Sequence, residues 1–479
     1  MGPERTRGVP ARWRPSPGAP WATARRWRAD PRRKARSARR RTVVRHRARA
    51  RRSGMTRIRR HVGAWRVTVL GLALLLLAVP GAAWLGRTAD AQPKEFKVGV
   101  ALSLSGIFSR DAALFKEVYD LWAETVNRAG GIKVKGTGYP VRITYYDDES
   151  SPQKSAQLVE RLATADKVDL ILGAFGSSIV FAATAVAEKY KYPYISGAAS
   201  ANPIFERGFK YTFATLNKTF DEVEAAAKVF TIAQPKPTRA AVIGSDHLFG
   251  KLSAEGFRKF LGEMGVEVVH FEIFPLDLQD YNSLLLKVKR ANPDVLLVGG
   301  LFSHAFRVMK AAKEVDFSPK GISFSYGPTV PEFLKEFGKD AEGVIAASEW
   351  LPSFTFRDPV FGSPKAFNEA IRKKHGHEAD YVQAAAAGGL VAQQKAIETL
   401  GLAPPLDERA REALMEQLHK QDVQTLYGQV KFGPDGGIVQ KPPIAVQIQN
   451  GKFVLVYPRE VGGVPAGKLI YPLAPWRSR

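Results

Sequence analysis

Two short stretches of small and hydroxyl-bearing residues are the best candidates for chemistry in this 479-residue chain. Residues 173–178 read Gly-Ala-Phe-Gly-Ser-Ser, and residues 196–202 read Ser-Gly-Ala-Ala-Ser-Ala-Asn. Each stretch follows a short apolar run that is typical of a buried strand. Backbone N–H groups and hydroxyls at such a place can hold an anion, and small side chains let a ligand approach the backbone. Ser177, Ser178 and Ser200 are therefore candidate ligands for a carboxylate, with simple helix capping as the alternative.

Motifs for catalysis and metal binding are missing from the sequence. It has no Gly-x-Ser-x-Gly elbow, phosphate loop, dinucleotide glycine pattern or His-Glu-x-x-His motif, and no cysteine. His375 and His377 form a close pair, but a metal needs further ligands, so a solvated loop is the simpler interpretation. Residues 147–149, Asp-Asp-Glu, can bind a cation but are better explained as a turn before the helix that Pro152 begins. We expect no catalytic residue, no metal and no cofactor.

The positive charge of the chain is concentrated near its N-terminus. The net charge is +25, yet residues 1–91 hold 24 Lys and Arg against 3 acidic residues, and residues 92–479 hold 47 against 43. The long second part is nearly neutral, which argues against nucleic acid as a partner. Residues 1–54 hold 19 Lys and Arg without an apolar period, so we expect a disordered basic leader. A translation start at Met55 and a nucleic-acid-binding arm are the alternative explanations.

Residues 55–91 have the order of an export signal. Several Arg residues precede an apolar run of 13 residues, 67–79, and a small-residue site follows at 89–91. The run has the length of a signal core and is shorter than the roughly 20 residues that span a bilayer. We expect cleavage before Gln92, by the general or the twin-arginine route, with an uncleaved anchor as the alternative. Without cysteine a lipid anchor on an N-terminal Cys is excluded, so we expect a freely diffusing periplasmic protein.

Short β-branched runs alternate with amphipathic helical patterns after the signal, as in parallel βαβ units. One set of strands and helices covers 96–215, and a second set with the same order covers 222–347. Helical patterns follow Trp350, and no strand is expected before Val430. The last two strands flank Asn450-Gly451, a strong hairpin signal.

The simplest fold for this order is an α/β fold with two doubly wound, Rossmann-like lobes joined by three crossings. We expect the crossings near residues 217, 347 and 428. The expected parts are lobe 1 (92–217 and 348–428), lobe 2 (218–347 and 429–458) and a C-terminal tail (459–479). Ligands of open α/β sheets bind beyond the carboxyl ends of the strands, so the cleft between the lobes is the expected site.

The ordered set of motifs resembles the leucine/isoleucine/valine-binding class of ABC-transporter solute receptors. The segments that carry the resemblance are 98–106, 127–132, 146–148, 173–178, 194–200 and 299–300, and together they cover about Phe96 to Tyr457. The resemblance implies a type I periplasmic-binding-protein fold whose lobes close on a small ligand. It also implies an ABC permease in the inner membrane as the partner, and we expect the receptor to be a monomer.

The resemblance further implies roles for single residues. In that class a ligand carboxylate is held at the positions of Ser177 and Ser200, and the carbonyl at the position of Ala198 accepts from the ligand's ammonium group. Phe249 stands where the class has an aromatic residue, often Tyr. The acid that neutralises the ammonium follows a Gly-Pro, whereas this chain has Thr329 there.

Thr329 leads to an expectation about the ligand. A buried ammonium group without a carboxylate partner is costly to desolvate, so an ordinary zwitterionic amino acid is disfavoured. Leu301 and Phe302 make the far wall apolar, which fits a carboxylate on an aromatic or aliphatic body, or an amide. Other residues can compensate for the missing acid at this position, namely Asp246, Arg110 or Glu349.

Arg110 can instead pair with the ligand's carboxylate or lie in solvent. Three functions are compatible with these residues. The favoured one is a solute receptor that closes on a small carboxylate-bearing ligand, either an amino acid or an aromatic or aliphatic carboxylate, and delivers it to a permease. A ligand-sensing regulator on the same fold, of the amide-sensor type, is the second. An esterase or amidase that uses Ser177 is the third, and it lacks a nominated histidine base.

Overall fold

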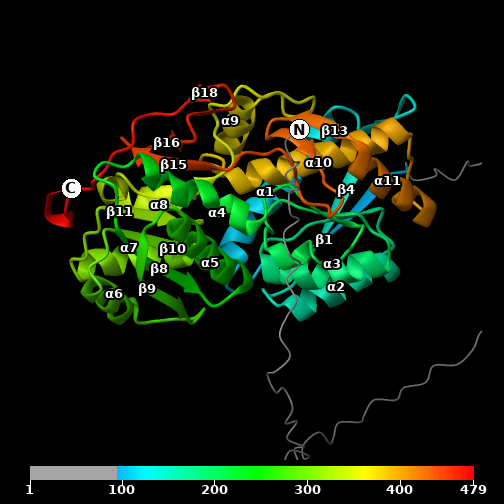
Figure 1. Ribbon diagram of the computed structural model, residues 1–479. Helices are drawn as coiled ribbons and strands as arrows, with labels where there is room; N and C mark the ends of the chain where they lie inside the picture. The colour runs from blue at the N-terminus through cyan, green and yellow to red at the C-terminus, as the bar shows by residue number, and fades with distance from the viewer. Residues whose placement is uncertain (1–93, 479) are drawn as a thin grey trace, which may run out of the picture. The chain divides into compact units, whose positions relative to one another are not determined.

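The computed structural model describes residues 94–478, and these fall in a single unit of the chain, Gly86–Arg479. The expected basic leader, 1–54, and the expected export signal, 55–91, lie outside the described residues. The described residues form two lobes, each built on its own β-sheet (Figure 1).

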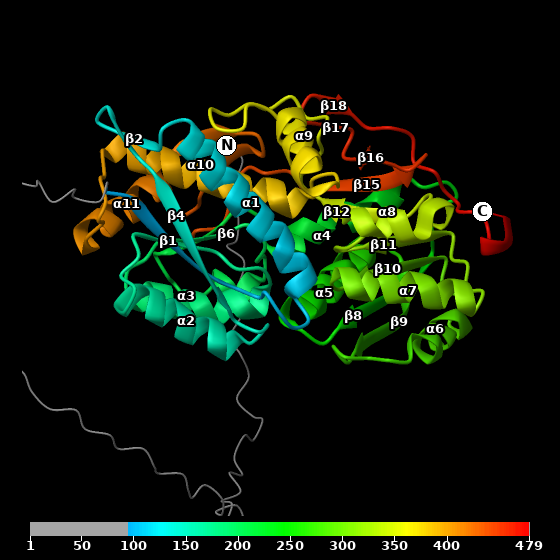
Figure 2. The ribbon, with the colours of Figure 1, turned by 180° about the vertical axis from the view of Figure 1, so that it is seen from behind.

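The first lobe is a parallel sheet of five strands in the order β4-β1-β5-β6-β7. Its strands are apolar and mostly buried, because helices cover both faces of the sheet. Helices α2 and α3 lie on one face, and α1 and α10 lie on the other (Figure 2). The bounds are β1 (Phe96–Leu102), α1 (Ser109–Arg128), β4 (Val141–Asp147), α2 (Pro152–Thr164), β5 (Leu170–Leu172), α3 (Ser177–Lys189), β6 (Tyr194–Ser196), β7 (Thr212–Ala214) and α10 (Tyr381–Leu400).

The second lobe has seven strands in the order β16-β15-β12-β11-β10-β8-β9. Five strands are parallel to their neighbours, and β15 and β16 extend the sheet in antiparallel fashion. One apolar core joins the sheet to α6, α7 and α8, and another joins it to α4 and α5. The bounds are α4 (Thr219–Lys228), β8 (Arg239–Ser245), α5 (Leu248–Glu263), β9 (Glu267–Phe274), α6 (Tyr281–Arg290), β10 (Val295–Gly299), α7 (Phe302–Glu314), β11 (Gly321–Phe324), α8 (Pro331–Phe337), β12 (Ile345–Ser348), β15 (Ile444–Gln449) and β16 (Lys452–Tyr457).

The hairpin predicted at Asn450-Gly451 joins β15 to β16. Both residues have positive φ, 52° and 67°, as a tight two-residue turn requires.

The two sheets, each with helices packed on it, confirm the fold class predicted from the sequence, two doubly wound lobes.

Smaller elements were harder to predict. The expectation of no strand before Val430 is wrong, because β13 (Asp422–Thr425) pairs with β14 (Gly428–Lys431). Two other hairpins, from β2 (Ile132–Val134) to β3 (Thr137–Tyr139) and from β17 (Glu460–Val461) to β18 (Val464–Pro465), lie outside both main sheets. The remaining helices are α9 (Pro364–His375) and α11 (Glu408–Lys420).

Three crossings connect the lobes. The first follows β7 and the second follows β12, near the positions expected at 217 and 347. The third comes later than residue 428, because β14 packs with α10 and α11, and Gly437 forms a bridge with Ala214 of β7. The lobe boundaries stay a prediction. The segment between Ile438 and Ile444 leads from the Gly437 bridge to β15 of the second sheet.

The C-terminal segment, expected to be a tail, lies along the second lobe. The Trp476 side chain is buried, and its indole N–H donates to the Phe317 carbonyl (2.7 Å). The segment also packs near the second crossing, where Thr355 N–H donates to the Gly462 carbonyl (3.0 Å). Among residues 94–478, no helix combines the length and apolarity that crossing a membrane requires.

Candidate ligand-binding site

A pocket lies between the two lobes, beyond the carboxyl ends of their parallel strands. Its free volume is small, about 30 Å³. Residues that follow β5, β6 and β7 line one wall, and residues that follow β8, β10 and β11 line the opposite wall. The first turns of α4 and α10 complete the lining.

The first predicted anion cradle forms part of this pocket. Gly176 ends the turn after β5 with a φ of 93°, which favours glycine, and α3 begins at Ser177. Gly176 and the buried Ser177 both line the pocket. First-turn N–H groups of an α-helix have no carbonyl partner within the helix, and the helix dipole makes this end attractive to an anion.

The second cradle is hydrogen-bonded to the first. Gly176 N–H donates to the Ala198 carbonyl (3.2 Å), and Ala201 N–H donates to Ser177 Oγ (3.3 Å). Ala198 and Ser200 also line the pocket. The structure therefore brings together the three residues for which the resemblance implied contacts with the ligand's carboxylate and ammonium.

The second lobe contributes a largely apolar wall. Phe249 and Leu301 line the pocket, as expected, together with Tyr326 and His247. His247 Nδ1 lies 2.9 Å from the Ser245 hydroxyl, and among the described residues Nε2 has no hydrogen-bond partner. Burial, and then the neighbouring His304, lower the pKa of His247 to about 3, so the ring is neutral at pH 7.

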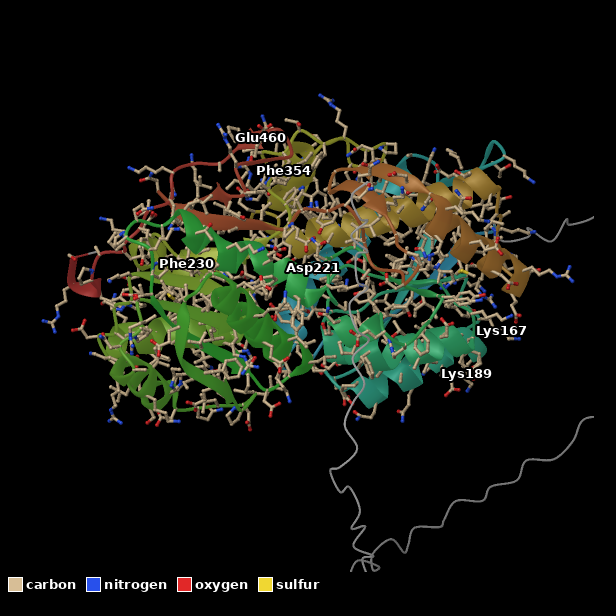
Figure 3. All side chains as sticks on the ribbon, viewed as in Figure 1. Lys167, Lys189, Asp221, Phe230, Phe354 and Glu460 are labelled. Atoms are coloured by element: carbon tan, nitrogen blue, oxygen red, sulfur yellow. The ribbon has the colours of Figure 1, made fainter. Side chains whose placement is uncertain are left out.

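Glu222, in the first turn of α4, is the acidic member of the described pocket lining. The Tyr381 hydroxyl donates to Glu222 Oε1 (2.8 Å), and the Ser200 side chain also lies within reach of this carboxyl group. Burial and then the charge of Glu349 raise the pKa of Glu222 to about 8. Asp221, one residue before Glu222, is exposed and is labelled near the middle of the view (Figure 3).

Among the pocket residues that sequence reasoning missed, Glu222 and His247 carry the carboxyl and imidazole groups. An acid in a first helical turn is ordinary helix chemistry, and a histidine after a strand is ordinary loop composition, so neither pattern carried a signal. We expected a ligand other than an ordinary amino acid because the predicted pocket had no acidic residue. Glu222 lines the pocket, so that argument no longer applies.

Two predicted site residues lie outside the pocket lining. Ser178 is half-buried next to Ser177 but does not line the pocket. Thr329, in the loop before α8, faces Asp380 at the start of α10 instead. Burial raises the pKa of Asp380 to about 6, and the Thr329 hydroxyl opposes that rise.

Arg110, a third predicted site residue, bridges the lobes at the edge of the pocket. Its guanidinium group forms an ion pair with Glu332 of α8 and lies 4.9 Å from the centre of the Phe302 ring. Arg110 belongs to α1 in the first lobe, while Glu332 and Phe302 belong to the second. The structure thus gives Arg110 a protein partner rather than a place in the described pocket lining.

Asp111 makes a second polar contact across the cleft. The Tyr326 hydroxyl donates to Asp111 Oδ1 (3.3 Å), and the Tyr326 ring lies 6.1 Å from the Phe175 ring. Burial raises the pKa of Asp111 to about 7, against the opposing charge of Arg110. Asp111 and Tyr326 are both buried where the two lobes meet.

Behind the pocket, one buried carboxylate joins the three crossings. Glu349 of the second crossing accepts a hydrogen bond from Asn217 N–H of the first (3.0 Å) and another from the Tyr427 hydroxyl. Lys441 of the third crossing donates to the Tyr427 carbonyl. Burial raises the pKa of Glu349 and lowers that of Lys441, while the two charges oppose these shifts.

The acidic motif at 147–149 has the structural role that the sequence favoured. Asp147 Oδ1 accepts from the N–H groups of Leu104 (3.0 Å) and Ser105 (3.1 Å), and Asp148 accepts from the Ser103 hydroxyl (2.6 Å). These bonds hold the loop between β1 and α1.

The histidine pair faces a carboxylate. His377 Nε2 lies 3.0 Å from Glu117 Oε2, and His375 Nδ1 lies 3.7 Å from Glu117 Oε1. Within residues 94–478, no group of three or more His, Asp or Glu side chains is arranged to hold a metal ion.

Comparison with known proteins agrees with this architecture. The model of the family described as periplasmic binding protein matches residues 95–452. The chain belongs to the periplasmic binding protein family. This confirms the resemblance to the leucine/isoleucine/valine-binding class, and it identifies a family of binding proteins rather than enzymes.

Individual members of the periplasmic binding protein family are similar over most of the chain. The leucine-, isoleucine-, valine-, threonine-, and alanine-binding protein of Pseudomonas aeruginosa is 24% identical over 76% of this chain and 91% of its own. The isoleucine complex of LivJ from Streptococcus pneumoniae has a TM-score of 0.65 at 22% identity and covers 75% of this chain and 98% of its own. A solute binding protein of Rhodopseudomonas palustris, in complex with 3,4-dihydroxybenzoic acid, has a TM-score of 0.65 at 20% identity. The match covers 80% of this chain and 99% of its own.

Proposed function

We propose that this periplasmic binding protein is the solute receptor of an ABC importer. Its two lobes close on a small ligand that carries a carboxylate, and the closed form is read by a permease in the inner membrane. The observation that carries the proposal is the pocket itself, where the start of α3 and the loop after β6 form an anion cradle opposite an apolar wall.

Both lobes contribute to the lining, so a ligand touches all of it only in the closed form. Binding free energy then shifts the equilibrium from open to closed, which is how a receptor signals occupancy. The names of the relatives support this proposal over a ligand-sensing regulator, because they are called binding proteins of amino acids and transporter components. A periplasmic location and a monomeric state belong to the same proposal.

A thermal-shift screen of the purified protein tests the proposal. The panel contains amino acids, aromatic carboxylates, short fatty acids and amides. A true ligand at about 100 times its Kd adds roughly 2.7 kcal/mol to the free energy of unfolding, so it raises Tm clearly. We expect a saturable shift from at least one carboxylate and no turnover of that compound. Stabilisation by amides alone would contradict the carboxylate cradle.

A further inference from the structure

Two neighbouring histidines of the second lobe, His247 and His304, differ in their hydrogen bonds. In His304, Nδ1 accepts from Leu301 N–H (3.1 Å) and Nε2 lies 3.2 Å from the Leu276 carbonyl, so both ring nitrogens have a partner. In His247, Nδ1 lies 2.9 Å from the Ser245 hydroxyl, but no described residue hydrogen-bonds Nε2. His247 lines the pocket and is only 8% exposed. A buried ring nitrogen without a partner is costly, so such groups are usually satisfied by protein, water or ligand.

The His247 ring is held in place from several sides. Ser245, the last residue of β8, lies against Nδ1, and α5 packs closely on this turn. A Cβ added to Gly250 of α5 would lie 2.5 Å from Ser245 Oγ and 2.8 Å from His247 Cε1, so this close packing requires glycine. The rings of Phe249 and Phe108 have their centres 6.2 Å and 6.5 Å from that of His247. A ring fixed in this way keeps Nε2 in one position, as a specific hydrogen bond to a ligand requires.

His247 belongs to the wall opposite the anion cradle. It follows β8 in the second lobe, whereas Ser177 and Ser200 follow β5 and β6 in the first. The centre of the Phe108 ring lies 6.5 Å from that of His247 and 6.2 Å from that of Phe175 in the cradle. The two polar sites are therefore close enough for one small ligand to reach both.

The neutral charge of the His247 ring limits the groups that it can bind. Burial, and then the neighbouring His304, lower the pKa of His247 to about 3, and the nearby charges of Asp246 and Lys251 pair with each other. A neutral ring offers no opposing charge to a second carboxylate, which would be costly to desolvate here. A hydroxyl group both donates and accepts, so it can pair with Nε2 in either tautomer of the ring.

We propose that His247 binds a hydroxyl group at the far end of the ligand and so selects hydroxylated monocarboxylates over their unsubstituted counterparts. This inference rests on the proposed function of the pocket and narrows its ligand class. The ligand has one carboxylate at the cradle, an apolar body, and a neutral hydroxyl that reaches Nε2. An unsubstituted ligand leaves Nε2 buried without a partner, and this loss is the source of the selectivity.

Titration calorimetry of the wild-type protein with matched pairs of compounds tests the inference. The members of each pair differ by one hydroxyl: benzoate and 4-hydroxybenzoate, 3-phenylpropanoate and 3-(4-hydroxyphenyl)propanoate, phenylalanine and tyrosine, pentanoate and 5-hydroxypentanoate. We expect the hydroxylated member of at least one pair to bind about tenfold or more tightly than its partner. Because the ring is neutral, this preference should agree within about twofold at pH 6 and pH 8. Equal or weaker binding of the hydroxylated member in every pair, or a preference that grows as pH falls, would overturn the role of His247 and leave the receptor function intact.

Two variants locate the effect. His247→Phe keeps a ring and removes both nitrogens, so it should reduce the preference for the hydroxyl to about twofold or less. His270→Phe is the matched control, because His270 lies on β9 of the same lobe, 3.2 Å from Glu272, and does not line the pocket. An unchanged preference in His247→Phe would overturn the inference, as would binding of other carboxylates of the panel with none of these eight compounds. Failure of the eight compounds and of the full carboxylate panel would overturn the proposed function, and the inference with it.

Discussion

Burial of Asp111 between the lobes should make the stability of the protein depend on pH. Its pKa is about 7 in the described form, against 3.8 for an ordinary Asp. The folded state therefore binds a proton that the unfolded state has lost between about pH 4 and pH 7. Over that range the contribution of Asp111 to stability falls as pH rises, and above pH 7 it stays constant.

Asp111→Asn should remove this pH dependence. Asparagine stays neutral and can still accept from Tyr326, so the variant should be more stable than the wild type at pH 8. A shift of about three pKa units corresponds to an upper limit of about 4 kcal/mol, and the two proteins should converge near pH 4. Urea unfolding at pH 4, 6 and 8 measures the difference. Glu124→Gln, on the exposed side of the same helix, is the control and should leave the profile unchanged.

The residues that the sequence predicted correctly for the pocket are those with a local signature. Ser177, Ala198 and Ser200 sit in small-residue turns after buried strands, and the resemblance added Phe249 and Leu301. Glu222 and His247 have no such signature, because only the docking of α4 and the closure of the lobes turn them toward the pocket. Arg110 was a candidate by position along the chain, and its partner Glu332 could not be found without the tertiary structure.

At the scale of elements, strands with long apolar runs were predicted most closely. β1 and β10 fall within the two expected sets of strands, and both are buried over nearly their whole length. Helix starts carry a weaker signal. α1 begins at Ser109, and its first turn carries polar residues that contact the second lobe. β13 is short and partly exposed, so it lacks an apolar pattern altogether.

The stability of the three crossings should depend on the buried carboxylate of Glu349. Removing this acid leaves Lys441 buried without its opposing charge, which typically costs 3–5 kcal/mol. We expect Glu349→Gln to lower the free energy of unfolding by about that amount, as measured by urea denaturation. The double variant Glu349→Gln with Lys441→Met removes the stranded charge and should recover at least half of the loss. Equal stability of the single and double variants would show that the pair is not coupled.

For the whole molecule, the contact between Arg110 and Glu332 should favour the closed form. Both side chains are partly exposed, so the ion pair is worth about 1 kcal/mol or less. Reversing one charge, Arg110→Glu, should speed ligand dissociation by about fivefold, because two acids then face each other across the cleft. Arg110→Glu with Glu332→Arg should restore the wild-type rate. Stopped-flow measurement at low and high salt checks both variants, and the effect of the single variant should shrink as salt rises.

The central claim is that the two lobes close on a carboxylate held at the start of α3. Titration calorimetry of Ser177→Ala, with the carboxylate ligand that stabilises the wild type most, tests it directly. Ser178→Ala is the matched control, because Ser178 is adjacent and does not line the pocket. We predict that Ser177→Ala weakens binding more than about tenfold while Ser178→Ala changes it less than about twofold. Equal affinity of Ser177→Ala and the wild type would contradict the claim.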